Sequence, residues 1–348
     1  MKTPLCIALL FIGGCGQDDA SDLLDDYLTR VNNATGTPVI DPGPFPTALV
    51  PYPRPRDLRL EQQDLRIGLL DLVSLEKCGL AELVAARNSG LGKVMTPSQQ
   101  LLYEHRFLGL ARACVDTLAT RPDAELQALL KEVVAVKERD ITRAFWNATM
   151  AGPEFALLFS LATTPLPLVD GDGTAVEEAL SYFVELRPRL GDAALALDSE
   201  KFEGHFYALQ KRRYGGQLLR AMEALTHSLD GAAAALEKRL ALKIVCFDGR
   251  PTPDARVMHA VFAKFYAGRI QPYLASVHHQ SRTYLTLVDH LGGNSPAAFR
   301  AYRDAQLGLD NPQGTYSQFT RAIQRHTRAW QRLFDQCGLS AAPPSSAR

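Results

Sequence analysis

Residues 252–292, TPDARVMHAVFAKFYAGRIQPYLASVHHQSRTYLTLVDHLG, decide the fold class. Apolar side chains recur in this stretch mostly every three or four residues, which is the period of an α-helix with one buried face. Pro272 lies inside the pattern and predicts a kink in the helix. The predicted buried face consists of Met258, Val261, Phe265, Ile270, Leu274, Val277, Ser281, Tyr284, Val288 and Leu291.

Similar stripes and clear helix starts occur elsewhere in the chain. Four predicted starts carry a capping side chain followed by proline, which is the combination favoured at helix N-termini. They are Thr96-Pro97, Thr252-Pro253, Ser295-Pro296 and Asn311-Pro312. Gln99 also completes a capping box with Thr96. The further apolar stripes occupy residues 103–118, 126–136, 218–240 and 316–337.

The domain organisation follows from these helices. Alternation typical of strands is scarce, so we predict an all-α fold, a bundle of long antiparallel helices with a proline-rich N-terminal segment. The bundle is expected over residues 57–340, with a candidate subdivision near 163–175 and a disordered tail at 341–348. Ahead of it we expect a tether with a short acidic helix at 15–34 and an extended proline-rich segment at 35–56, acting as a spacer or a strap.

The first fifteen residues, MKTPLCIALLFIGGC, are typical of a bacterial lipoprotein signal peptide. The apolar run is too short to cross a bilayer as a helix, and Gly13 and Gly14 stand directly before Cys15. We expect residues 1–14 to be removed and Cys15 to carry acyl chains such as palmitate, which gives stable anchoring. Gly16 favours the inner leaflet of the outer membrane, with the bundle facing the periplasm. Cleavage without lipidation is the alternative.

Charge and motifs exclude several function classes. Lys plus Arg and Asp plus Glu both number 38, so the formal net charge is zero and no strong field favours nucleic acid. Residues 87–94, RNSGLGKV, match a phosphate-binding loop only in part, because Arg87 replaces its first glycine and Val94 replaces its hydroxyl residue. We therefore expect neither a nucleotide nor a nucleic-acid partner.

Four cysteines follow Cys15, and an even number in an oxidising compartment predicts two disulfides. They are Cys78, Cys114, Cys246 and Cys337. Of the three possible pairings, position favours Cys78 with Cys114 and Cys246 with Cys337, because each then stays within one half of the chain. Four reduced buried thiols and a zinc site are the alternatives, although no zinc-type spacing is present.

No residue pattern predicts a metal, a cofactor or a catalytic group. Asp170 and Asp172 begin a loop that resembles a calcium site but lacks the glycine and the glutamate that such a loop requires. His279 and His290 lie about 16 Å apart on one predicted helix, too far to share an ion. His326 borders an apolar stripe and is expected to be a buried, hydrogen-bonded histidine.

Two polar groups remain as candidate sites. The first, where a loop interrupts the helices, consists of Arg87, Asn88, Lys93 and Glu104. A deep pocket there in which burial keeps Glu104 protonated would favour an enzyme, and a flat surface would favour a binding protein. The second lines one side of the last helix and is either a solvated face or a contact for an anionic surface. It consists of Arg321, Arg325, Arg328 and Arg332.

Residues 69–108, LLDLVSLEKCGLAELVAARNSGLGKVMTPSQQLLYEHRFL, resemble the signature region of a family of proteobacterial lipoproteins, the domain of unknown function 3080 family. The predicted lipidated cysteine, the acidic first helix, the PYPRPRDL segment and the positions of Cys78 and Cys114 fit the same pattern. The resemblance covers essentially the whole mature chain. It implies a lipoprotein and brings no known activity, cofactor or catalytic residue.

The sequence thus favours a membrane-anchored lipoprotein that acts by binding rather than by catalysis. Candidate partners are an envelope protein, a cell-wall strand or another lipoprotein. The alternative is an envelope hydrolase or a peptidoglycan-modifying enzyme with a site between helices near Arg87–Glu104. A small-molecule carrier, which a large apolar cavity would indicate, is the third hypothesis.

Overall fold

A computed structural model describes most of the chain, namely residues 19–38, 49–63, 75–120, 123–169, 173–192, 194–293 and 295–341. Within these ranges the chain forms helices joined by turns and no β-strand, so the predicted all-α fold is confirmed. Cys15 and the Asp170 and Asp172 loop lie outside the described residues.

The helices in these ranges are of three kinds. In chain order, the α-helices are α1 (Ala20–Thr35), α2 (Pro55–Leu58), α4 (Ala81–Asn88), α5 (Pro97–Leu118), α6 (Ala124–Ala148), α7 (Pro153–Leu158), α8 (Gly173–Leu186), α9 (Ser199–Gln210), α10 (Tyr214–Leu242), α11 (Pro253–Val261), α12 (Gln271–Gly292), α13 (Ala297–Tyr302) and α14 (Thr315–Cys337). The 3-10 turns are η1 (Leu75–Cys78), η2 (Gly92–Val94) and η3 (Arg187–Arg189), and the π-helical stretches are η4 (Phe262–Ile270) and η5 (Arg303–Leu307).

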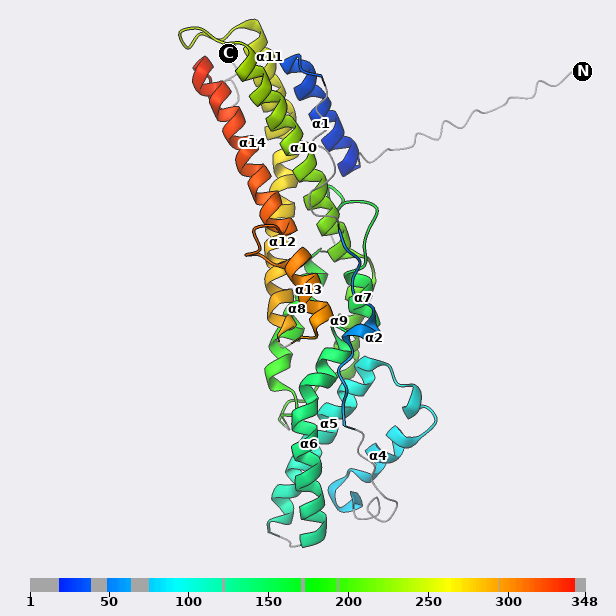
Figure 1. The fold of residues 1–348 in the computed structure, drawn as a ribbon. Coiled ribbons are helices and arrows are strands. Elements are labelled where there is room, and N and C mark those ends of the chain that lie inside the picture. The colour runs from blue at the N-terminus through cyan, green and yellow to red at the C-terminus, as the bar shows by residue number, and fades with distance from the viewer. Residues whose placement is uncertain are drawn as a thin grey trace, which may run out of the picture.

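These helices form an elongated bundle (Figure 1). Helices α10, α12 and α14 run along its length towards one end, where α11 and the end of the described chain also lie. Helices α5 and α6 pack side by side at the opposite end, with α4 beside them. The shorter helices α7, α8, α9 and α13 fill the middle.

Helix α1 is a member of the bundle rather than a helix that stands ahead of it. Its predicted apolar face is buried, from Leu23 at 5% exposed to Val31 at 0%. This face packs on α10, where the Ser228 hydroxyl donates a hydrogen bond of 3.2 Å to the carbonyl of Leu24. Because the face needs an apolar partner to be stable in water, the acidic helix is folded into the bundle.

A hydrogen-bonded trio ties α1 to α14. The Tyr27 hydroxyl lies 2.6 Å from His326 Nε2. The Trp330 Nε1–H points at both the Tyr27 hydroxyl oxygen and His326 Nε2, each 3.1 Å from Nε1. His326 is 0% exposed. The prediction of a buried, hydrogen-bonded histidine at this position is confirmed.

The long helix 253–292 contains a wide turn that its sequence pattern hides. Pro272 has no N–H for an α-helical hydrogen bond, and it stands in the first turn of α12, directly after the π-helical stretch η4. The wider π turn moves the buried face to Phe262 and Tyr266, while Val261 and Phe265, which were expected to be buried, lie at its margin. The irregularity therefore precedes the proline.

Two of the four predicted caps are confirmed and two are wrong. Thr96 forms a capping box with Gln99, and the Thr252 hydroxyl accepts from the N–H of Ala255. Helix α13 begins at Ala297, with Pro296 rather than Ser295 at the N-cap position. Helix α14 begins only at Thr315, because Asn311 instead closes a turn with the N–H of Gln313 at 3.0 Å.

The described part of the proline-rich segment, together with residues 57–63 that follow it, forms a strap on the bundle. Residues 49–54 are not helical, as expected, although α2 then adds one helical turn. The Tyr52 ring stacks on Phe159 with ring centres 4.7 Å apart, and its hydroxyl donates to the carbonyl of Met150. Trp146 Nε1 donates to the carbonyl of Leu58 at 2.7 Å. These contacts hold the strap against the end of α6, the turn that follows it and the end of α7.

The apolar interior consists of two clusters. The larger one contains residues from both sides of the region 163–175, so that region does not separate two cores. The smaller one lies between η1, α4, α5 and α6 and includes Leu75, Val84 and Phe107. Leu110, expected on the buried stripe of α5, is 43% exposed.

Two disulfides brace the two ends of the bundle. Cys78 is bonded to Cys114, which joins η1 to α5. Cys246 is bonded to Cys337, which joins the loop after α10 to the last residue of α14. This is the pairing that the order of the cysteines favours.

Removal of either disulfide is expected to destabilise the protein. The variant Cys246→Ser/Cys337→Ser should lose about 4 to 5 kcal/mol of unfolding free energy, because the bond closes a loop with a sequence separation of 91. Urea denaturation of the oxidised protein measures the difference. Recovery of a Cys78–Cys246 or Cys78–Cys337 peptide in non-reducing mapping would contradict this connectivity.

Burial of His326 predicts a pH dependence of stability. Desolvation lowers its pKa to about 3, against about 6.5 in an unfolded chain. Between these values the unfolded state binds more protons, so stability falls as the pH drops from 6.5 towards 3.

The variant His326→Asn should flatten the plot of unfolding free energy against pH by about 1.4 kcal/mol per pH unit near pH 5. Urea unfolding of the native protein and of the variant at a series of pH values measures both slopes. Equal slopes in native protein and His326→Asn would contradict the burial of a neutral imidazole.

Candidate functional site

A cleft of about 830 Å³ opens where α4, η2, α5 and α6 meet the strap. Its lining is Arg59, Leu60, Glu61, Gln62, Gln63, Val84, Arg87, Asn88, Lys93, Gln100, Tyr103, Glu104, Phe107, Val133 and Lys137. We call this the α4–α6 cleft. The structure thus brings together all four members of the first candidate cluster.

The loop between α4 and α5 shapes one wall of the cleft. The Arg87 guanidinium reaches over the loop and donates to the carbonyl of Gly92 at 2.6 Å, and Ser89 Oγ accepts from the N–H of Gly92. A Cβ at Gly92 would come within 3.0 Å of the carbonyl oxygens of Ala86 and Arg87. The run RNSGLGKV therefore builds a tight turn onto the end of α4 rather than a phosphate-binding loop, whose sequence context requires a preceding strand.

The floor of the cleft carries an ion pair. Lys137 of α6 lies 2.8 Å from the carboxylate of Glu104 on α5, and each side chain is only 15% exposed. The Lys137 ammonium also lies 5.6 Å from the centre of the Phe107 ring, within cation–π range. Each of these two largely buried charges therefore has its counter-charge within the protein.

Tyr103 lies beside this pair. Burial raises its pKa to about 12, the charge of Glu104 adds to that rise, and Arg87 partly opposes it. Its hydroxyl is therefore neutral at physiological pH and can donate a hydrogen bond to a ligand in the cleft.

The remaining charges leave the cleft positive. With Glu104 and Lys137 paired, Arg59, Arg87 and Lys93 outweigh Glu61 among the lining residues. Arg59 and Lys93 are exposed and form no ion pair within the described part of the chain. A polar, net-positive cleft with an arginine and a lysine at its mouth is suited to hold carboxylate or phosphate groups.

Sequence reasoning missed the residues that come from distant segments. Lys137 follows the buried Val136 directly in sequence but faces Glu104, 33 residues earlier. The position of Lys137 beside a predicted buried stripe could have indicated that its charge is paired with a carboxylate. Residues 59–63 gave no such signal, because their position depends on backbone contacts such as Leu60 N–H to Asn147 Oδ1 at 2.8 Å.

The second candidate group is not a continuous set of available cations. Arg325 is bound between Asp230 and Glu237 of α10, and Arg321 donates to the carbonyl of Pro312. Arg328 and Arg332 are exposed and form no ion pair within the described ranges. Of the four arginines, Arg325 is therefore the one whose charge is paired with carboxylates in the described ranges, and Arg321, like Arg328 and Arg332, is exposed and keeps its positive charge.

No metal site or membrane-spanning helix is found in the described ranges. These ranges contain no group of three or more His, Cys, Asp or Glu side chains that could hold a metal ion. Likewise, none of the described helices is both long and apolar enough to span a bilayer.

Comparison with known proteins gives a family. A family model described as "Protein of unknown function (DUF3080)" matches residues 24–341. The chain belongs to the DUF3080 family. The match begins within α1 and ends after α14, so the α4–α6 cleft and both disulfides lie within the DUF3080 region. No curated protein and no solved structure matches the chain significantly.

The ion pair on the cleft floor makes a prediction about stability. Glu104→Gln should lower the unfolding free energy by about 2 kcal/mol, because it leaves the largely buried Lys137 ammonium without its counter-charge. The matched double variant Glu104→Gln/Lys137→Met should recover most of that loss. Thermal and urea unfolding measure both. A single variant as stable as the native protein would show that the pair is not formed.

Proposed function

We propose that this protein is a lipid-anchored, periplasm-facing lipoprotein of the bacterial envelope that acts by binding a partner in the α4–α6 cleft. The partner carries negatively charged groups, such as carboxylates of an envelope protein or a cell-wall strand. The observation that carries the proposal is the positive, polar cleft whose central carboxylate is held in an ion pair.

The N-terminal sequence and the disulfides support the location. The lipoprotein-type sequence that ends at Cys15 directs export and acylation. Disulfides persist in oxidising compartments such as the periplasm, and the described chain contains two. Outer-membrane sorting rests on Gly16 alone.

The chemistry of the cleft supports binding. Its volume of about 830 Å³ lies in the range of ligand pockets. The lining contains Arg, Lys, Gln, Asn and Tyr side chains, which form charge-assisted and neutral hydrogen bonds, and none of its described residues is Ser, Thr, Cys or His. These groups can orient an anionic partner through hydrogen bonds and through their positive charge.

One observation favours the second candidate, an envelope hydrolase or peptidoglycan-modifying enzyme. Glu61 and Glu104 line the same cleft, and paired carboxylates perform general acid–base chemistry in glycoside hydrolysis. An enzyme would release soluble fragments from purified cell wall, and Glu104→Gln would stop that release. A binding protein would bind the cell wall or another partner and release no soluble fragments.

The anchor is tested by metabolic labelling. Cells given labelled palmitate should incorporate it into the native protein and into Cys6→Ala, whose replaced cysteine lies inside the signal peptide. Cys15→Ala should carry no label and should migrate as the unprocessed precursor. Labelled Cys15→Ala, or an unlabelled native protein, would contradict the lipoprotein assignment.

The cleft is tested by photo-crosslinking in living cells. A photoreactive amino acid at Asn88, an exposed lining residue, should give a discrete adduct. The variant Arg87→Gln/Lys93→Gln should reduce that adduct at least fivefold, because it removes two cations that attract the partner.

The control places the same photoreactive residue at Tyr207, which is 59% exposed on α9. This position should not give the Asn88 adduct. The same adduct from both positions, or an adduct that is insensitive to the charge variant, would contradict binding in the cleft.

A further inference from the structure

The loop between α10 and α11, residues 243–252, and the adjoining parts of these two helices carry exposed apolar side chains at the end of the bundle opposite α5 and α6. Phe247 is 63% exposed, Ile244 52%, Leu242 72% and Val257 54%. We call these four residues the apolar tip. They are clustered in sequence, and they account for four of the ten large hydrophobic residues that are exposed in the described chain.

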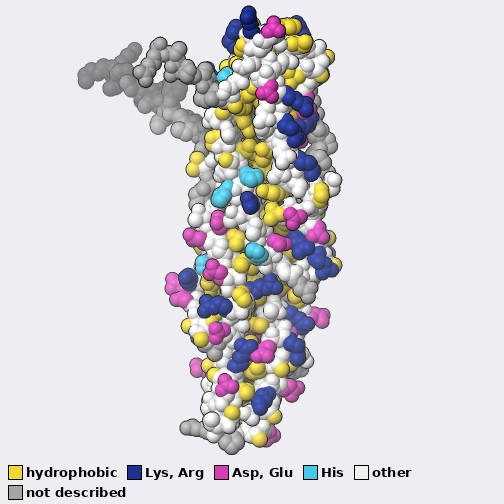
Figure 2. Space-filling model, turned by 90° about the vertical axis from the view of Figure 1, so that its left-hand side faces the viewer, with side chains coloured by type: hydrophobic (Ala, Val, Ile, Leu, Met, Phe, Trp, Pro, Cys, Tyr) yellow, Lys and Arg dark blue, Asp and Glu magenta, His cyan; other side chains and the backbone are white. Residues whose placement is uncertain are grey.

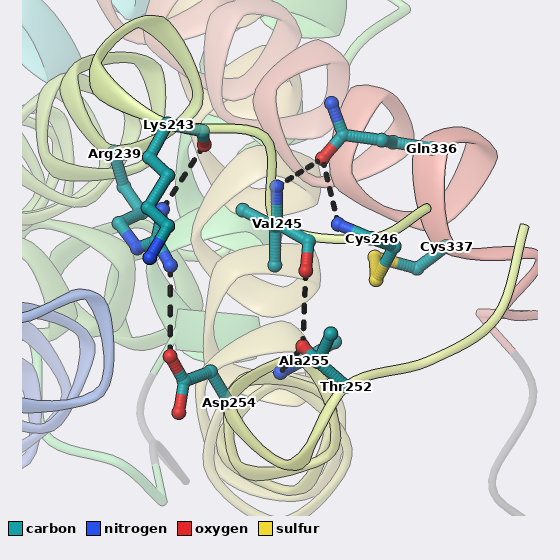
Figure 3. Close-up of polar contacts among 9 residues, drawn as sticks. All are labelled: Arg239, Lys243, Val245, Cys246, Thr252, Asp254, Ala255, Gln336 and Cys337. Atoms are coloured by element: carbon teal, nitrogen blue, oxygen red, sulfur yellow. Dashed lines mark hydrogen bonds and ion pairs between the residues drawn. A yellow bond between two sulfur atoms is a disulfide. The ribbon is translucent and has the colours of Figure 1, made fainter. Parts of the chain in front are cut away.

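The backbone that carries the apolar tip is firmly braced (Figure 3). Cys246 is bonded to Cys337 at the end of α14. The side-chain oxygen of the neighbouring Gln336 accepts from the N–H of Val245 at 2.9 Å and from that of Cys246 at 3.4 Å. The residues between the exposed Ile244 and Phe247 are therefore fixed to α14 by one covalent and two hydrogen bonds.

Both ends of the loop are also tied down (Figure 3). The Thr252 hydroxyl donates to the carbonyl of Val245 at 3.0 Å and caps α11. Arg239 donates to the carbonyl of Lys243 at 3.0 Å and lies 3.6 Å from the carboxylate of Asp254. The loop is thus joined to α10, α11 and α14 together.

A tight turn at Phe247 completes the tip. The N–H of Arg250 donates to the carbonyl of Phe247 at 3.0 Å, and the two residues between them have positive φ angles, 50° at Asp248 and 68° at Gly249. Positive φ at both central positions is the type I′ turn that Asp-Gly favours. The turn leaves the Phe247 side chain exposed on a backbone with little freedom to fold it away.

Basic side chains surround the apolar tip. Residues 238–256 contain five Lys or Arg and two Asp. The exposed cations are Lys238, Lys243, Arg250 and Arg256. Figure 2 shows Lys and Arg side chains beside hydrophobic ones at this end of the molecule.

We propose that the apolar tip inserts into the headgroup region of an anionic lipid bilayer. Apolar side chains gain free energy by leaving water for the acyl boundary, and nearby cations are attracted by anionic headgroups. The braced loop has little conformational entropy to lose on insertion. This contact is additional to the acyl anchor and does not rest on it.

A bilayer fits the tip better than a second copy of the chain. Four side chains expose at most a few hundred Å², whereas a stable interface buries about 800 Å² on each partner. The surplus of positive charge would also repel an identical tip. Anionic lipid complements both the apolar and the basic part of the surface.

The test uses the oxidised chain from Gly16 onward, which contains every described residue and no lipid. It should cosediment with vesicles of 70% phosphatidylcholine and 30% phosphatidylglycerol, because the apolar side chains enter the bilayer and the basic ones are attracted by its anionic headgroups. Ile244→Ser/Phe247→Ser should weaken this partitioning at least tenfold. Lys243→Gln/Arg250→Gln should weaken binding to these vesicles while leaving any binding to neutral vesicles unchanged.

Tyr207→Ser, which removes an exposed aromatic residue from α9, is the matched control and should bind like the native chain. Circular dichroism and melting temperature show that each variant is folded. The proposal is overturned if the native chain does not bind these vesicles, or if a folded Ile244→Ser/Phe247→Ser binds equally well. It is also overturned if Ile244→Ser/Phe247→Ser abolishes self-association, measured by sedimentation velocity, and leaves vesicle binding unchanged.

Discussion

The close packing of α10 between α1 and α14 is the constraint on which the rest of the structure depends. More than half of the 29 residues of α10 are buried. Small residues let other segments approach the α10 backbone closely, since a Cβ at Gly216 would come within 3.0 Å of the carbonyl oxygen of Ser160, just after α7. Ser228 donates a hydrogen bond to the backbone of α1. A closely packed seam of this kind favours one rigid arrangement over many loosely packed ones.

The two ends of the bundle build their surfaces on this seam in the same way. At one end Cys246–Cys337 fixes the loop after α10 to α14 and exposes the apolar tip. At the other, Cys78–Cys114 fixes η1, and with it the start of α4, to α5. Cys114 belongs to the same apolar cluster as Val84, Phe107 and Val133, which line the α4–α6 cleft. In each case a covalent link joins a segment outside the long helices to a long helix of the bundle.

The sequence predicts the elements of this structure better than their junctions. The helical period and the caps at Thr96 and Thr252 are local signals, and the cluster from Arg87 to Glu104 was found because it interrupts that period. The partners of those residues were not predictable, because Lys137 is placed by the packing of α6 on α5 and residues 59–63 by hydrogen bonds to α6. Likewise the π-helical η4 shifts the buried face from Phe265 to Tyr266 to accommodate tertiary packing, which no local pattern encodes.

Our central claim is that the positive α4–α6 cleft holds an anionic envelope partner. Hydrogen exchange mass spectrometry of the purified, oxidised protein, with and without a detergent extract of the cell envelope, tests this claim most directly. The account predicts slower exchange in the segments that line the cleft, namely residues 59–63, α4, η2, the first half of α5 and the part of α6 around Val133 and Lys137. This protection should be lost in Arg87→Gln/Lys93→Gln. Protection along α10 and α14 instead, or protection that the charge variant leaves intact, would contradict it.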